Sequence, residues 1–326
     1  MGGPTQAEGG RVSIPVLPDS ASTLAPKTDL ILLALTALSV VVMAIVFLPM
    51  IYFLFKYRRG RPADRTPLDL PTMKIEVTWT VIPLVLMMGL YAWASEVYLE
   101  EETPPLGAIE INVVGKQWMW KIEHAEGNAE INELHVPVGK PVKLTLASQD
   151  VIHSFFIPAF RIKQDVVPGR YTSEWFQPTK PGTYHLFCSQ YCGNNHSQMI
   201  GSVVVMEPAA YERWLAESSP GQTLAQQGAS LFRELGCSGC HMGNSVVHAP
   251  RFEGLYGKPV ALQTGQVVIA DDAYLRDCIL TPAARVPGGY SPLMPSFQGR
   301  VNEGEIFQLI AYIKSLASAP VEGSPP

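Results

Sequence analysis

The stretch from Leu30 to Phe55 contains no charged side chain, and this constrains the fold more than any other feature. Roughly 20 apolar residues are enough to cross the hydrocarbon core of a bilayer as a helix. The stretch is therefore predicted to span a membrane, even with Pro49 inside it. A second apolar run covers residues 77–95. Together they predict a transmembrane hairpin over residues 29–98.

The loop between the two runs is basic. It carries Lys56, Arg58, Arg59, Arg61, Arg65 and Lys74 against Asp64 and Asp69. Positively charged loops stay in the cytoplasm, so both termini and everything after residue 96 are predicted to lie outside. The net charge of −5, without a basic patch beyond this loop, argues against a nucleic-acid partner.

Four of the five cysteines fall in two short motifs. In the first, Cys188 and Cys192 are followed by His196 and Met199. Thiolates with imidazoles bind soft, redox-active copper, and two thiolates rather than one indicate two copper ions sharing them. With His153 upstream, this is the ligand layout of a cupredoxin. The alternative is a disulfide between the two cysteines on the oxidising side of the membrane.

The residues around this motif have a β pattern. Apolar and polar residues alternate over Ile109–Val114 and Val142–Leu146, and Gly-Pro pairs such as Pro168-Gly169 punctuate the chain. Several short strands with regular turn signals predict an all-β sandwich or barrel, which we place at residues 99–210.

The second motif, Cys237-Ser-Gly-Cys240-His241, is typical of c-type haem attachment. The two cysteines would form thioether bonds to the haem, and His241 would be an axial ligand. Met294, followed by Pro295, has the separation typical of the sixth ligand in small class I cytochromes c. Such Met/His ligation raises the iron potential. The fifth cysteine, Cys278, is interpreted as a small buried hydrophobic residue.

The C-terminal residues fit the small all-α domain of a class I cytochrome c. A short amphipathic helix is expected over residues 228–236, and Asn302–Glu305 resembles a helix start with a capping-box acid. Apolar residues at helical spacing then predict a closing helix. Pro250 lies in a segment resembling the one whose proline carbonyl orients the proximal His in these cytochromes.

Residues 29–206 resemble subunit II of cytochrome c oxidase, in the haem–copper oxidase superfamily, here with a cytochrome c domain fused at the C-terminus. The resemblance is carried by the segments Glu76–Pro83, Gly115–Trp120, His153–Phe155 and Lys163–Arg170, and by the copper motif. It implies a multidomain membrane protein with these parts: polar N-terminal segment 1–28, transmembrane hairpin 29–98, cupredoxin CuA domain 99–210, linker 211–224, cytochrome c domain 225–318 and disordered tail 319–326.

The resemblance also implies the ligands of a binuclear copper centre, CuA. Cys188 and Cys192 would bridge both coppers, and His153 and His196 would be the terminal ligands. Met199 would be a weak axial ligand to one copper, and the backbone carbonyl of Gln190 would serve the other. Many relatives have a glutamate at position 190 that also reaches a Mg²⁺, and Gln190 lacks that charge.

Two further residues match functional positions of the family. Trp118 corresponds to the tryptophan through which electrons enter, although an aromatic pair with Trp120 is also compatible with simple strand packing. Glu76 corresponds to the acid at the mouth of a proton channel into subunit I, although an acid at the lipid–water boundary also fits.

The implied function is electron transfer within a respiratory oxidase. Electrons would pass from haem c to CuA and on to subunit I, where O₂ is reduced to water with proton translocation. The implied partners are subunit I, subunit III and an external donor such as a cytochrome c or a copper protein. The implied location is the bacterial plasma membrane, with the soluble domains periplasmic. The alternatives are the CuA subunit of a related nitric oxide reductase and a free-standing membrane-anchored electron carrier.

Overall fold

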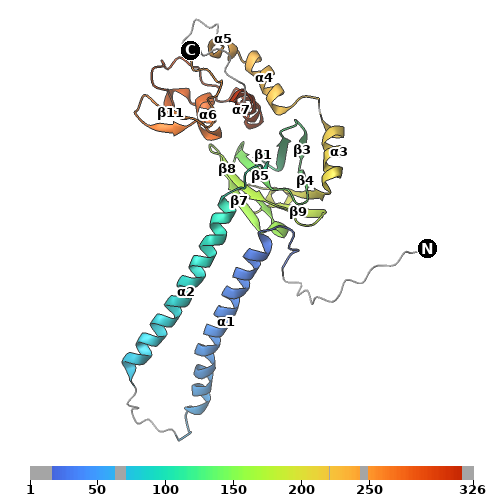
Figure 1. Cartoon of the computed structure of the whole chain (residues 1–326). Helices are drawn as coiled ribbons and strands as arrows, with labels where there is room; N and C mark the ends of the chain where they lie inside the picture. Colours follow the sequence, from blue (N-terminus) through green and yellow to red (C-terminus); the bar gives the residue numbers. More distant parts are fainter. Residues whose placement is uncertain (1–16, 63–70, 220, 243–248, 318–326) are drawn as a thin grey trace, which may run out of the picture.

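The computed structural model describes residues 17–62, 71–219, 221–242 and 249–317. Its parts follow one another along the molecule: a long helical hairpin, a β-domain and a mainly helical C-terminal domain (Figure 1). The first sixteen residues of the predicted N-terminal segment lie outside the described residues, as do residues 63–70 of the basic loop and the predicted tail.

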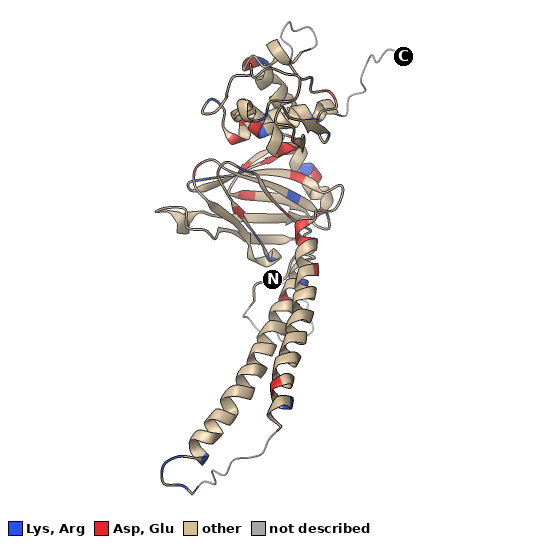
Figure 2. Ribbon diagram, turned by 90° about the vertical axis from the view of Figure 1, so that its left-hand side faces the viewer, with Lys and Arg blue, Asp and Glu red and all other residues tan. Residues whose placement is uncertain are grey.

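The hairpin consists of α1 (Ala25–Lys56) and α2 (Thr72–Glu102), both long and apolar enough to cross a membrane. Their middle portions are almost free of charge (Figure 2). Both helices extend beyond the predicted apolar runs, and at one end their polar residues anchor the hairpin to the β-domain. Asp29 pairs with Arg161 at 2.7 Å, and the Glu100 carbonyl accepts a hydrogen bond from Trp175.

The β-domain is a sandwich of two five-stranded sheets, which confirms the predicted cupredoxin-like fold. The first sheet has the order β3 (Ala129–Ile131), β2 (Met119–His124), β1 (Ile109–Lys116), β5 (Val142–Ser148) and β8 (Thr172–Phe176). The second has the order β4 (Glu133–Pro137), β10 (Ile200–Met206), β9 (Gly182–Cys188), β6 (His153–Ile157) and β7 (Ile162–Val166). Fully buried residues such as Trp120, Leu144, Phe155 and Phe176 form the core.

Short 3₁₀ turns complete the sandwich and the C-terminal domain. They are η1 (Pro158–Phe160), η2 (His196–Gln198) and η3 (Pro282–Ala284). Strands β1 and β5 are parallel, as are β4 and β10, and the other pairs are antiparallel. This arrangement leaves β6 and β9 as neighbours, so their ends can present side chains to one site.

The predicted linker is largely helical. Helix α3 (Pro208–Ser218) covers most of it, and Trp214 stacks on His135 of β4 with ring centroids 4.5 Å apart. Asn128 also donates hydrogen bonds to the Leu215 carbonyl and to Ser218. These long-range contacts fix α3 on the sandwich, and the local sequence pattern does not reveal them.

The C-terminal domain contains α4 (Leu224–Glu234), α5 (Ser238–His241), β11 (Pro259–Ala261), β12 (Val267–Ile269), α6 (Asp272–Leu280) and α7 (Glu303–Ala317). Helix α4 begins before the predicted residue 228 because Thr223 and Gln226 form a capping box. The expected cap at Asn302 and Glu305 is present. The short hairpin β11–β12 departs from the predicted all-α composition.

Helices α4 and α7 cross closely at Gly228. A Cβ atom there would lie 1.9 Å from the Gln308 carbonyl oxygen, so only glycine permits this approach. Phe232 of α4 and Ile306, Leu309 and Ile313 of α7 join the buried core of the domain.

The C-terminal domain packs on the outer face of the first sheet. Phe307 of α7 stacks on Tyr171 with ring centroids 5.0 Å apart and forms a buried cluster with Val114 and Ala147. Arg276 of α6 pairs with Glu303 at 2.5 Å and donates a hydrogen bond to the Gly169 carbonyl. The two soluble domains therefore share an interface with both apolar and charged contacts.

Candidate metal centres

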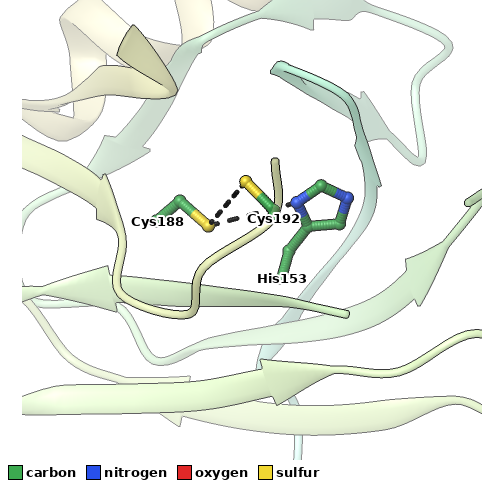
Figure 3. A group of neighbouring side chains, drawn as sticks. All are labelled: His153, Cys188 and Cys192. Atoms are coloured by element: carbon green, nitrogen blue, oxygen red, sulfur yellow. Dashed lines mark hydrogen bonds between the residues drawn. The ribbon is translucent and has the colours of Figure 1, made fainter. Parts of the chain in front are cut away.

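The structure brings all the predicted copper ligands together at one end of the sandwich. His153 begins β6, Cys188 ends β9, and Cys192, His196 and Met199 follow on the next loop. Figure 3 shows the two sulfurs and the His153 imidazole turned toward one another. His153, Cys188, Cys192 and Met199 are all buried, so water is largely kept from these donors.

The donor atoms lie at distances suited to shared metal ions. The two Sγ atoms are 3.8 Å apart. Cys188 Sγ lies 4.0 Å from His153 Nδ1, and Cys192 Sγ lies 3.4 Å from His196 Nδ1. Met199 Sδ is 3.8 Å from Cys192 Sγ, and the Gln190 carbonyl oxygen is 3.2 Å from Cys188 Sγ. Soft sulfur and nitrogen donors in this number suit copper.

The two cysteines are free thiols in the structure rather than the alternative disulfide. Burial opposes ionisation of Cys188, but hydrogen bonds from His153 and the local backbone lower the pKa of this thiol to about 6. Burial and the neighbouring Cys188 raise the pKa of Cys192 to about 12. A bound cation would favour the second thiolate by compensating its charge, which fits a metal site.

Asp150 orients the His153 ring, and the sequence analysis did not identify it. Its Oδ1 lies 2.8 Å from His153 Nε2, and its Oδ2 accepts a hydrogen bond from the Gln117 N–H at 2.7 Å. Partial burial would raise the pKa of Asp150, but these hydrogen bonds lower it. The carboxylate turns Nδ1 of His153 toward the thiols. The sequence signal was an acid three residues before the histidine.

We expect Asp150→Asn to weaken copper binding by about tenfold or more, because such supporting hydrogen bonds orient a ligand and raise its basicity. A copper titration of the purified chain, followed by absorbance, measures the change. Asp277→Asn, which alters an ion pair in the C-terminal domain, is the matched control and should leave copper affinity unchanged. Equal affinity of the Asp150 variant and the wild type would contradict the orienting role.

The structure places Trp118 beside the loop that carries Cys192, His196 and Met199, which we call the copper loop. Its Nε1 donates to the Cys192 carbonyl at 3.3 Å, and the side chain of neighbouring Gln117 donates to the same oxygen at 2.8 Å. The Trp118 ring is half-buried and packs against the core of the sandwich. Glu76 lies at the other end of the molecule, exposed near the start of α2.

The haem motif forms a separate site in the C-terminal domain. Cys237 immediately precedes α5, which contains Cys240 and His241, and both thiols are free and half-buried. His241 Nδ1 lies 2.8 Å from the Pro250 carbonyl oxygen, and its ring stacks on Phe252 with centroids 4.4 Å apart. This contact leaves Nε2 as the nitrogen that can bind iron, so these residues fit a c-type haem.

The remaining predicted residues of this domain pack against its core. Met294 is partly buried against the apolar cluster that α6 and α7 form. Cys278 packs against the same cluster and is half-buried. Burial raises the pKa of Cys278 to about 11, so this thiol is un-ionised at neutral pH.

Comparison with known proteins relates two segments of the chain to one family. Residues 12–95 match the transmembrane domain of cytochrome c oxidase subunit II, and residues 127–207 match its periplasmic domain. The cytochrome c oxidase subunit 2 of Alkalihalophilus pseudofirmus is 31% identical over 307 residues, covering 87% of this chain and 84% of that protein. Because 87% of the chain is matched, this similarity continues well beyond residue 207.

Other relatives match a smaller share of the chain. The alternative cytochrome c oxidase subunit 2 of Bradyrhizobium diazoefficiens is 31% identical over 209 residues, covering 53% of this chain and 73% of that protein. A crystal structure of the periplasmic domain of subunit II of cytochrome oxidase from Bradyrhizobium japonicum is 29% identical with a TM-score of 0.35, covering 36% of this chain and 96% of that one.

Proposed function

This chain belongs to the cytochrome c oxidase subunit II family, and on that premise we propose that it delivers electrons from its own cytochrome c domain, through its cupredoxin domain, to subunit I of a respiratory oxidase. The observation that carries the proposal is the convergence of two thiols, two imidazoles, a thioether and a backbone carbonyl at one buried site. Reduction of O₂ to water then belongs to subunit I.

The copper-binding residues have distinct roles in this proposal. Cys188, Cys192, His153 and His196 would hold the copper ions of CuA, with the two thiolates shared between them. Met199 and the Gln190 carbonyl would be the weaker ligands. The bound copper pair supplies a one-electron redox centre, and the rigid sandwich beneath its ligands limits their rearrangement. Burial of His153, Cys188, Cys192 and Met199 limits the access of water to the site.

In the C-terminal domain we assign Cys237 and Cys240 to covalent attachment of haem c, His241 and Met294 to its axial positions, and the Pro250 carbonyl to orientation of the His241 ring. The haem supplies the second one-electron centre. The hydrogen bond between His241 and Pro250 and the stacking of His241 on Phe252 support this assignment, because together they hold the ring in one orientation.

The interface between the soluble domains supports transfer within the chain. Stacking of Tyr171 on Phe307 and the contacts of Arg276 hold α6 and α7 against the first sheet. That sheet includes β1 and β5, whose ends lead to Gln117 and Asp150 beside the copper loop. A fixed neighbour can transfer electrons without a diffusional encounter.

The hairpin would dock the chain on subunit I, and subunit III would complete the assembly. In this arrangement Glu76 collects protons on the cytoplasmic side, while both soluble domains lie on the periplasmic side of a bacterial plasma membrane.

Trp118 is assigned as the electron-accepting residue beside the copper loop, supported by its contact with the Cys192 carbonyl. An external cytochrome c or copper protein would be the donor.

Gentle solubilisation and affinity purification of the chain test the proposal. We expect a multi-span partner containing haem a or b to copurify, and the complex to consume O₂ when a reduced cytochrome c is supplied. Isolation of the chain alone, with full electron-carrier activity, would support the free-standing carrier instead. A copurified complex that reduces nitric oxide but not O₂ would assign the chain to the nitric oxide reductase branch.

A further inference from the structure

A second cluster of metal-binding side chains lies on strands that contribute nothing to the copper site. Glu130 of β3 and Glu133 and His135 of β4 each offer one ligand atom, and these atoms lie within 4.8 Å of one another. Helix α3 covers the cluster from one side, because Trp214 stacks on the His135 ring. We name these three residues the Glu130 cluster.

Glu130 is held in place before any ion binds. Its Oε1 lies 2.7 Å from His124 Nε2 and accepts a hydrogen bond from the His135 backbone N–H at 3.2 Å. The other nitrogen of His124 contacts the Tyr211 hydroxyl at 3.3 Å, and His124 is fully buried. This chain of contacts resembles the outer hydrogen bonds that orient carboxylate ligands in metal sites.

The Oε2 atom of Glu130 faces the imidazole of His135. Glu130 Oε2 and His135 Nδ1 are 2.5 Å apart, and their side chains are only 9% and 14% exposed. Glu133 is exposed at the open side of the cluster. Among the ion pairs of the described residues, none joins a lysine or arginine to Glu130 or Glu133. Among the described residues, Glu130 therefore has only the imidazoles of His124 and His135 as ion-pair partners.

We propose that Glu130, Glu133 and His135 bind one divalent cation of the zinc class, with water at the remaining position. One imidazole nitrogen and two carboxylate oxygens are ordinary zinc ligands, and three protein ligands with an open position form a common zinc arrangement. The ion takes the place of the proton between Glu130 and His135. The bound ion would link β3 to β4 beneath α3, the helix that precedes the cytochrome domain. The inference does not depend on the proposed electron-transfer function.

The test uses the full chain in detergent, without a histidine tag and with its copper site loaded, so that zinc cannot occupy that site. Equilibrium dialysis against Zn²⁺ alone, followed by metal analysis, gives the zinc content and affinity. We expect one saturable zinc ion per chain, with affinity lowered about tenfold or more in both Glu133→Gln and His135→Gln. Glu133 is exposed, so its variant should fold normally even if the His135 variant does not.

His185→Gln is the matched control, because His185 is an exposed imidazole of the same domain on β9. This variant should bind zinc as tightly as the wild type. Unchanged zinc affinity in Glu133→Gln would overturn the proposal and leave an ion pair between Glu130 and His135. Loss of zinc in His185→Gln would also overturn it, since the ion would then lie elsewhere.

Discussion

Replacement of Cys188 by serine is expected to abolish the binuclear copper spectrum while leaving the C-terminal haem reducible. A serine hydroxyl is a hard donor that stays protonated at neutral pH, so it cannot share two soft copper ions as a thiolate does. Cys188 also contacts His153, Cys192 and the Gln190 carbonyl, so its loss removes the centre of the donor set. Absorption and electron paramagnetic resonance spectra of the copper-loaded chain measure the change.

Cys278→Ser is the matched control for this prediction. Cys278 is also a free, partly buried thiol, but it lies in α6 of the C-terminal domain, away from the copper loop. Its serine variant should retain the full copper spectrum. If Cys188→Ser kept the signal of an electron delocalised over two coppers, the bridging role assigned to Cys188 would be wrong.

Most residues of the candidate metal site could be gathered from the sequence because they lie close together in it. Cys188, Cys192, His196 and Met199 follow one another within residues 188–199, and this spacing favours a metal site over a disulfide. His153, which alone would be interpreted as a structural histidine in an apolar stretch, could be added only because that cluster of possible ligands follows it in the chain. Asp150 was missed because its second partner, the Gln117 N–H, is distant in the sequence and reaches it only in the folded sandwich.

In the fold as well, elements set by the local sequence pattern were predictable, whereas elements that depend on long-range contacts were not. Apolar length predicts both hairpin helices, and residue alternation predicts strands such as β1 and β5. Helix α3 was missed because tertiary contacts stabilise it: Trp214 stacks on His135, and Asn128 donates to the Leu215 carbonyl. Strands β11 and β12 are three residues each, too short to produce a clear alternation.

The sequence pattern also does not predict the interface between the two soluble domains. Tyr171 and Phe307 are far apart in the chain, and each can be interpreted alone as an ordinary core residue. Arg276 lies on the otherwise apolar side of α6, where a charge needs a partner. Its contacts with Glu303 and the Gly169 carbonyl explain why a buried guanidinium is tolerated there.

Replacement of Met294 by alanine is expected to lower the reduction potential of the C-terminal haem. A thioether ligand favours ferrous iron, so its loss leaves water or a stronger donor at the sixth position and favours the ferric state. We expect a fall of more than about 60 mV, which is a tenfold change in the equilibrium of a one-electron centre. A potentiometric titration of the purified chain, followed at the haem absorption bands, measures the shift.

Met242→Ala is the matched control, because Met242 directly follows His241 and its side chain is 54% exposed. A residue adjacent to the proximal ligand cannot reach the opposite face of the haem, so this variant should keep the wild-type potential. An unchanged potential in Met294→Ala would exclude Met294 as the axial ligand. A fall in Met242→Ala as large as in Met294→Ala would instead indicate that both changes act through disturbed packing around the haem.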